Sequence, residues 1–133
     1  TSVILGKHLD KRSEDREKQI HTLPTLIPEA VGRGIVLGMW ALMYLLPVVY
    51  VFRLPQYFSW PVLLVWLTPL LLKKSERQFI WNAFTHPRPA EAPETAKGFW
   101  PLWFVAAALV HTRLYGGIIV LGMVASMVLK LIR

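Results

Sequence analysis

Long uncharged stretches separated by single basic residues dominate the pattern along the chain. Residues 34–52 and residues 54–72 carry no formal charge, and only Arg53 separates them. At roughly 1.5 Å per residue, each stretch makes about 28 Å of helix, which is close to the ~30 Å hydrocarbon core of a bilayer. Two membrane-crossing helices are therefore predicted, at about 31–53 and about 56–73.

The residues that join these two helices predict a tight turn. Pro55 stops a helix because its ring removes a backbone N–H donor. Tyr57, Phe58 and Trp60 follow it, and aromatic side chains of this kind favour the headgroup region of a membrane. The first two helices are expected to form a hairpin that turns at these residues.

The last third of the chain allows two structures. One is a single helix over 99–131, which places Arg113 near the bilayer centre at a cost of about 2.5 kcal/mol or more. The other breaks near the pair Gly116 and Gly117. Residues 99–112 then lie at the interface, and a third crossing helix runs over about 114–132. The sequence favours the second structure, because Arg113 can then extend its charged end to the headgroups.

The polar segments complete a predicted all-α membrane protein. Residues 1–29 form a tail dense in both charges with little apolar stripe, which predicts a solvated helix or a segment ordered by a partner, outside the core of the membrane domain 30–133. The loop 74–98 contains a stretch at 75–84 whose apolar side chains predict an amphipathic helix on the membrane surface.

Composition and charge agree with this architecture. Of 133 residues, 54% are hydrophobic and 17% are charged, against about 25% charged in soluble domains. The absence of cysteine excludes disulfides, cysteine zinc sites and a cysteine nucleophile. The net charge of +7 gathers at the ends of the apolar stretches, so anionic phospholipids are the expected counterpart and nucleic acid is not.

The distribution of basic residues predicts the orientation. Most of them share a side with the N-terminus, whereas Arg53, Lys130 and Arg133 lie opposite, which favours an N-terminus on the positive-inside face. We expect the mitochondrial inner membrane with the N-terminus in the matrix, or else a bacterial inner membrane or thylakoid. The first residue is threonine, which a cleaved targeting peptide or the omission of preceding residues would explain equally well.

Few residues point to chemistry. The sequence shows no catalytic, metal or cofactor-binding constellation, and bound phospholipid is the only ligand expected. Helix one is expected to present Trp40 and Tyr44 to its surroundings. Small residues at close-packing spacing predict helix contacts at Gly34, Gly38, Gly122 and Ser126. Side chains at the ends of the apolar stretches predict contacts with lipid headgroups or partners at Arg33, Lys73, Lys74, Arg77, Trp100, Trp103, His111 and Arg113.

Three functions follow as hypotheses. The first is a non-catalytic accessory subunit that supports assembly, stability and lipid packing in a larger membrane complex, with an organellar respiratory complex as the expected host. The second is a small membrane-embedded lipid-binding protein or lipid-modifying enzyme with its site near His111 and Arg113. The third, a channel or carrier, is disfavoured because no Asp or Glu lies within the predicted spans.

Overall fold

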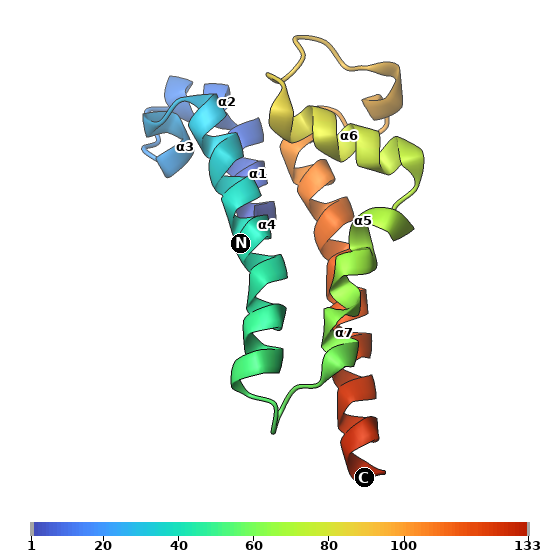
Figure 1. Ribbon diagram of the computed structural model, residues 1–133. Coiled ribbons are helices and arrows are strands. Elements are labelled where there is room, and N and C mark those ends of the chain that lie inside the picture. The colour runs from blue at the N-terminus through green and yellow to red at the C-terminus, as the bar shows by residue number, and fades with distance from the viewer. Residues whose placement is uncertain (1, 133) are drawn as a thin grey trace.

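The computed structural model describes residues 2–132, and within that range it is built from helices and loops without any strand. Two helices dominate, α4 (Glu29–Arg53) and α7 (Trp103–Leu131), and both are long and apolar enough to cross a membrane. Figure 1 shows them side by side, with most of the shorter helices at one end of the pair and one segment running beside α7. The predicted all-α class is confirmed.

The shorter elements are distributed along the whole chain. In order they are α1 (Ser2–Asp10), α2 (Arg12–Glu17), α3 (Leu23–Leu26), the 3₁₀-helix η1 (Trp60–Leu67), α5 (Thr68–Leu71), α6 (Lys74–Thr85) and the 3₁₀-helix η2 (Glu94–Ala96). Helix α6 covers the stretch 75–84 that was predicted as amphipathic, and it buries Ile80, Ala83 and Phe84.

The second apolar stretch is shorter and more irregular than the predicted helix 56–73. The chain leaves α4 after Arg53 and returns as η1 and then α5, which together cover 60–71. Pro61 and Pro69 each stand in the first turn of one of these elements, where proline is tolerated, and neither can donate the backbone hydrogen bond that a continuous α-helix needs. A regular helix over the whole stretch is therefore not formed.

Segment η1 packs closely on α7. A Cβ built on Gly122 would lie 2.5 Å from the carbonyl oxygen of Pro61 and 3.0 Å from the Cα of Val62, so only glycine leaves room for this backbone. One turn further, the Ser126 hydroxyl accepts the backbone N–H of Ser59 at 2.8 Å. Both small residues of α7 thus pack inside the chain.

The structure corrects the favoured interpretation of the last third. Helix α7 is continuous, and Gly116 and Gly117 lie within it rather than at a break. The first residues of α7 pack among α1 and α6. Arg113 is exposed beside Lys73, where the uncharged run of α7 begins.

The N-terminal segment is not a solvated tail. Helix α1 lies antiparallel to the start of α7 and buries Leu9 to 3% exposure. The carboxylate of Asp10 accepts the backbone N–H groups of Phe104 and Val105, each at 2.9 Å. A Cβ on Gly6 would lie 3.0 Å from the backbone of Phe104, so the two helices touch backbone to backbone. The sequence prediction missed this contact because Asp10, in a segment dense in charge, was expected to face water, whereas it caps the start of α7.

The charged residues after α1 fasten the loop that leads to α4. Arg12 donates to the carbonyl oxygens of Pro24 at 2.8 Å and Ile27 at 2.6 Å, and Arg16 donates to that of Thr25 at 3.0 Å. A hydrogen bond from a charged donor is worth about 1.5–3 kcal/mol. The arginines therefore help to hold α3 against α2.

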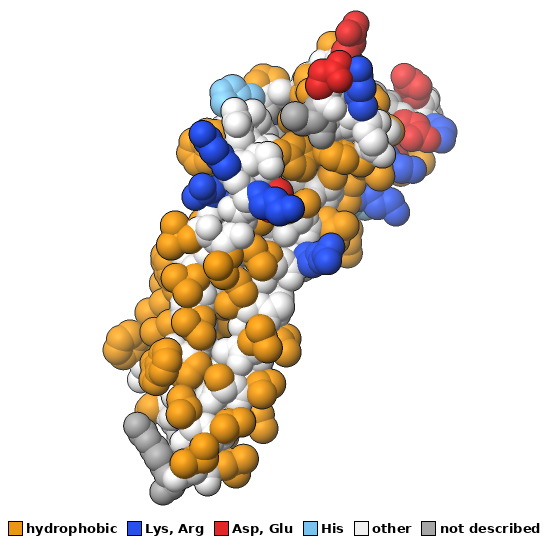
Figure 2. Space-filling model, turned by 90° about the vertical axis from the view of Figure 1, so that its right-hand side faces the viewer, with side chains coloured by type: hydrophobic (Ala, Val, Ile, Leu, Met, Phe, Trp, Pro, Cys, Tyr) orange, Lys and Arg blue, Asp and Glu red, His pale blue; other side chains and the backbone are white. Residues whose placement is uncertain are grey.

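Charge separates along the length of the molecule. On the face in Figure 2 the charged side chains occupy the upper half, and the lower half is hydrophobic. At the opposite end, the Lys130 ammonium donates to the carbonyl oxygen of Pro55 at 2.8 Å, which brings Lys130 beside the turn after Arg53. The predicted grouping of these two basic residues is thus seen, and Arg133 lies outside the described residues.

Candidate functional site

Two pairs of side chains, one on each long helix, meet near the middle of the molecule. Trp40 and Tyr44 are four residues apart on α4, and His111 and Tyr115 are four apart on α7, so each pair occupies one helix face. The Tyr44 hydroxyl lies 2.9 Å from His111 Nε2, within hydrogen-bond distance. The His111 imidazole also stacks on the Trp40 indole, with ring centroids 4.0 Å apart.

These contacts bury His111 almost completely. It is 5% exposed, and its second nitrogen, Nδ1, is buried without a hydrogen-bond partner among residues 2–132. Tyr115 also belongs to this cluster. Its hydroxyl donates to the carbonyl oxygen of Met43, and its ring packs edge to face on that of Tyr44, with ring centroids 5.3 Å apart. The cluster joins α4 to α7 and holds the imidazole in a fixed orientation.

An apolar cleft opens beside this cluster. It has a volume of about 320 Å³ and lies between α4 and α5, with α6 above and His111 at its inner end. Most of its lining is aliphatic or aromatic, including Leu37 and Phe84, and the exposed side chains Arg77 and Trp81 stand on its α6 side. The lining of the cleft therefore combines a mostly apolar wall with an imidazole and a guanidinium.

Comparison with known proteins identifies no relative of this chain. No protein-family model matches the chain, and the searches of curated proteins and of solved structures find no significant match. The geometry alone therefore indicates the chemistry.

The chemistry of the lining suits an amphiphilic ligand. The apolar wall fits a hydrocarbon chain, while the imidazole and the guanidinium can each contact a polar group. Within residues 2–132, no group of three or more His, Cys, Asp or Glu side chains is arranged to hold a metal ion.

Several predicted contact residues lie elsewhere than expected. Trp103 is 5% exposed and packs in the core. Trp100 is partly buried beneath the Arg88 guanidinium, which lies 4.7 Å from its ring centroid. Arg33 is 8% exposed, with its Nε 3.4 Å from Glu29 Oε1, so it pairs within the chain. Trp103 and Arg33 are thus largely buried within the chain, and Trp100 is partly buried, so their main contacts are internal.

The remaining predicted residues divide between two surfaces. Arg77 lines the cleft beside His111, whereas Lys73 and Arg113 line a separate groove between α6 and α7. Lys74 is exposed at the start of α6. Gly34 and Gly38 face open space, since a Cβ on either would meet nothing within 4 Å.

Sequence reasoning missed the partners of His111. Trp40 and Tyr44 were expected to face outward, but Trp40 is buried and Tyr44 bonds the imidazole. A signal was present: an aromatic pair on helix one and a His–Tyr pair on the last helix share the same spacing of four residues. Matching polar–aromatic faces on two apolar helices predict that these faces meet, since unpaired polar groups are costly in lipid.

Proposed function

We propose that this chain is a membrane-embedded protein that binds an amphiphile with a long apolar chain in the cleft between α4, α5 and α6. The observation that carries the proposal is a buried imidazole, His111, held by Tyr44 and Trp40 at the inner end of an otherwise apolar cleft. The second imidazole nitrogen, Nδ1, has no partner among residues 2–132, so it is free to bond a polar group of a ligand.

The proposal includes an arrangement in the membrane. Helix α7 crosses between Arg113 and Lys130, about 25 Å apart along its axis, and the contact of His111 with Tyr44 sets the part of α4 from about Tyr44 to Arg53 at the same depth. Segments η1 and α5 form a third, short crossing of about 22 Å, taking roughly 2.0 Å per residue in the 3₁₀ part. Its return beside α4 completes the proposed hairpin.

Replacement of His111 tests the cleft. His111→Phe keeps an aromatic ring for stacking on Trp40 but removes the polar group, and we expect the Kd of a fluorescent long-chain fatty acid to rise about tenfold, which is the loss of one hydrogen bond of about 1.4 kcal/mol. Tyr44→Phe should give a smaller rise, because it only frees the imidazole. Binding is measured in nanodiscs against the exposed controls His21→Phe and Tyr57→Phe. Equal affinities for His111→Phe and His21→Phe would contradict the proposal.

A second function, a subunit of a larger membrane assembly, is favoured by a different observation. Gly34 and Gly38 lie one turn apart on an exposed face of α4, with open space beside both. Small residues at this spacing allow another helix to approach closely in lipid. An organellar respiratory complex stays the proposed host, with the N-terminus on the matrix side.

Bulky side chains on this face test the second function. Gly34→Ile with Gly38→Ile should leave the unfolding temperature of the isolated chain unchanged or slightly raised, because the new side chains meet no neighbour and glycine is a poor helix former. Co-purification with other subunits in mild detergent should fall severalfold. Gly116→Ile, at an open glycine of α7, serves as the control. Migration of the wild-type chain as a free monomer would exclude this function.

A further inference from the structure

A groove runs along one side of α7, on the other side of α6 from the His111 cleft. It consists of two hollows, of about 470 Å³ and about 520 Å³, which share Glu76, Leu109 and Val110 in their lining and therefore adjoin each other. The chemistry of its lining changes in order along α7: aromatic first, charged next, and aliphatic last.

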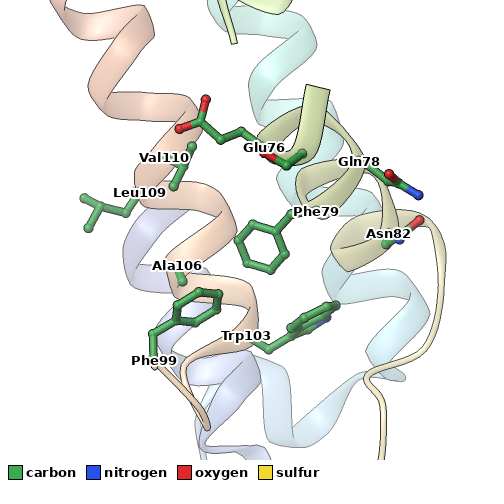
Figure 3. Close-up of a pocket in the computed structure, with 10 residues that line it drawn as sticks. Glu76, Gln78, Phe79, Asn82, Phe99, Trp103, Ala106, Leu109 and Val110 are labelled. Carbon is green, nitrogen blue, oxygen red and sulfur yellow. The ribbon is translucent and has the colours of Figure 1, made fainter. Parts of the chain in front are cut away.

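The first hollow combines aromatic rings with a carboxylate. Figure 3 shows Phe79 of α6 pointing toward α7, with Phe99 and Trp103 beside it. The Phe79 centroid lies 5.2 Å from that of Phe99 and 5.0 Å from that of Trp103. Glu76 lines the same hollow, and one of its oxygens accepts the backbone N–H of Lys73 at 2.9 Å. Aromatic faces beside a carboxylate are a favourable environment for an organic ammonium group.

The second hollow begins with two basic residues and continues as an apolar wall. Lys73 and Arg113 line it, both are exposed, and neither makes an ion pair with any of residues 2–132. Below them the wall is formed by Leu114, Gly117 and Leu121. A Cβ on Gly117 would meet nothing within 4 Å, so the groove stays open along the helix.

We infer that this groove binds a phospholipid whose headgroup carries both an ammonium and a phosphate group. The ammonium lies against the aromatic rings near Glu76, the phosphate lies between Lys73 and Arg113, and an acyl chain follows the wall from Leu114 to Leu121. This order matches that of the lipid from headgroup to tail. Glu76 disfavours a purely anionic headgroup, because a partly buried carboxylate repels a second negative charge. The inference does not rest on the cleft at His111.

Lipid retention tests the inference. The full chain is incorporated in vesicles of equal parts phosphatidylcholine, phosphatidylethanolamine and phosphatidylglycerol, then purified in mild detergent, and the lipids that remain bound are quantified by mass spectrometry. Phosphatidylcholine or phosphatidylethanolamine should exceed phosphatidylglycerol about fivefold. Lys73→Gln and Arg113→Gln should each lower phospholipid retention about fivefold, as expected for one basic residue near a lipid phosphate. Lys74→Gln, the same change on the neighbouring residue, should have no effect.

Substitution of Glu76 separates charge selection from general lipid adhesion. Glu76→Gln keeps an acceptor at the start of α6 but removes the negative charge, so phosphatidylglycerol should rise to parity while total retention stays the same. Preference of the wild type for phosphatidylglycerol, or equal retention by Lys73→Gln, Arg113→Gln and Lys74→Gln, would overturn the inference. His111→Phe should leave this retention unchanged, so failure of the cleft and failure of the groove are distinguished. If Arg113→Gln does not fold, Lys73→Gln and Glu76→Gln, both at the start of α6, decide the result.

Discussion

Replacing Gly122 with leucine is expected to lower the free energy of unfolding by about 3 kcal/mol or more. A Cβ at this position would lie 2.5 Å from the Pro61 carbonyl oxygen, and the atoms in the way belong to the backbone, which cannot turn aside as a side chain can. Overpacking typically costs about 1–3 kcal/mol even where side chains adjust. The η1 segment must therefore move away from α7, which also breaks the hydrogen bond between Ser59 and Ser126.

The matched control lies on the same helix. Gly117→Ala introduces a Cβ that meets nothing within 4 Å, so it should leave stability unchanged or raise it by up to ~1 kcal/mol through better helix propensity. Unfolding is followed by circular dichroism in detergent. Equal stability of Gly122→Leu and Gly117→Ala would show that η1 does not pack on α7 as described.

The second large effect is expected at Asp10. Asp10→Ala should cost about 2–3 kcal/mol, because the backbone N–H groups of Phe104 and Val105 lose their acceptor at a buried helix start. The change should release α1 from α7 first, which limited proteolysis of the N-terminal segment measures. Glu17→Ala, at an exposed residue of α2, should change stability by less than about 0.5 kcal/mol. Equal protease resistance of the two variants would contradict the capping role.

The same residue predicts a pH dependence. Burial raises the pKa of Asp10 above its ordinary 3.8, although the backbone N–H groups of Val105 and Phe104 and the nearby Arg88 oppose the rise. Because the folded protein then holds this proton more tightly than the unfolded chain, the contribution of Asp10 to stability is greatest below pH 3.8 and falls as the pH rises through the raised pKa. Asp10→Asn does not titrate. The free energy of unfolding of the wild type, relative to that of this variant, should therefore fall as the pH rises and the Asp10 carboxyl loses its proton. A rise over the same interval would reverse the assigned sign.

Local sequence patterns predicted the elements that depend on local rules. The uncharged run between Arg33 and Arg53 indicated α4, and the apolar spacing within 75–84 indicated α6, because helix length and amphipathic period are properties of a single segment. The grouping of basic residues at the ends of apolar stretches likewise followed from the sequence alone.

The errors concern contacts between distant segments. Asp10 resembles any surface carboxylate until the start of α7 is placed beside it, and His111 resembles a lone interface histidine until Tyr44 faces it. The Gly116–Gly117 pair suggested a break because glycine is a poor helix former, but an apolar surrounding favours a helix in which every backbone group is paired. The close packing of the 3₁₀ segment on α7 likewise depends on the space that Gly122 leaves. In each case the deciding partner is remote in the sequence.

The pairing of α1 with α7 has a consequence for biosynthesis. The Asp10 carboxylate and the Phe104 amide that it accepts are 94 positions apart, so α1 is made long before the helix on which it rests. At about 5–20 residues per second, the ribosome delivers that partner some 5–20 s later. During this interval Leu9 and the surface of α1 at Gly6 are not covered by α7. Helix α1 can dock only after α7 has been synthesised. Helix α1 is thus translated well before α7, and it reaches its native place only after α7 has been made.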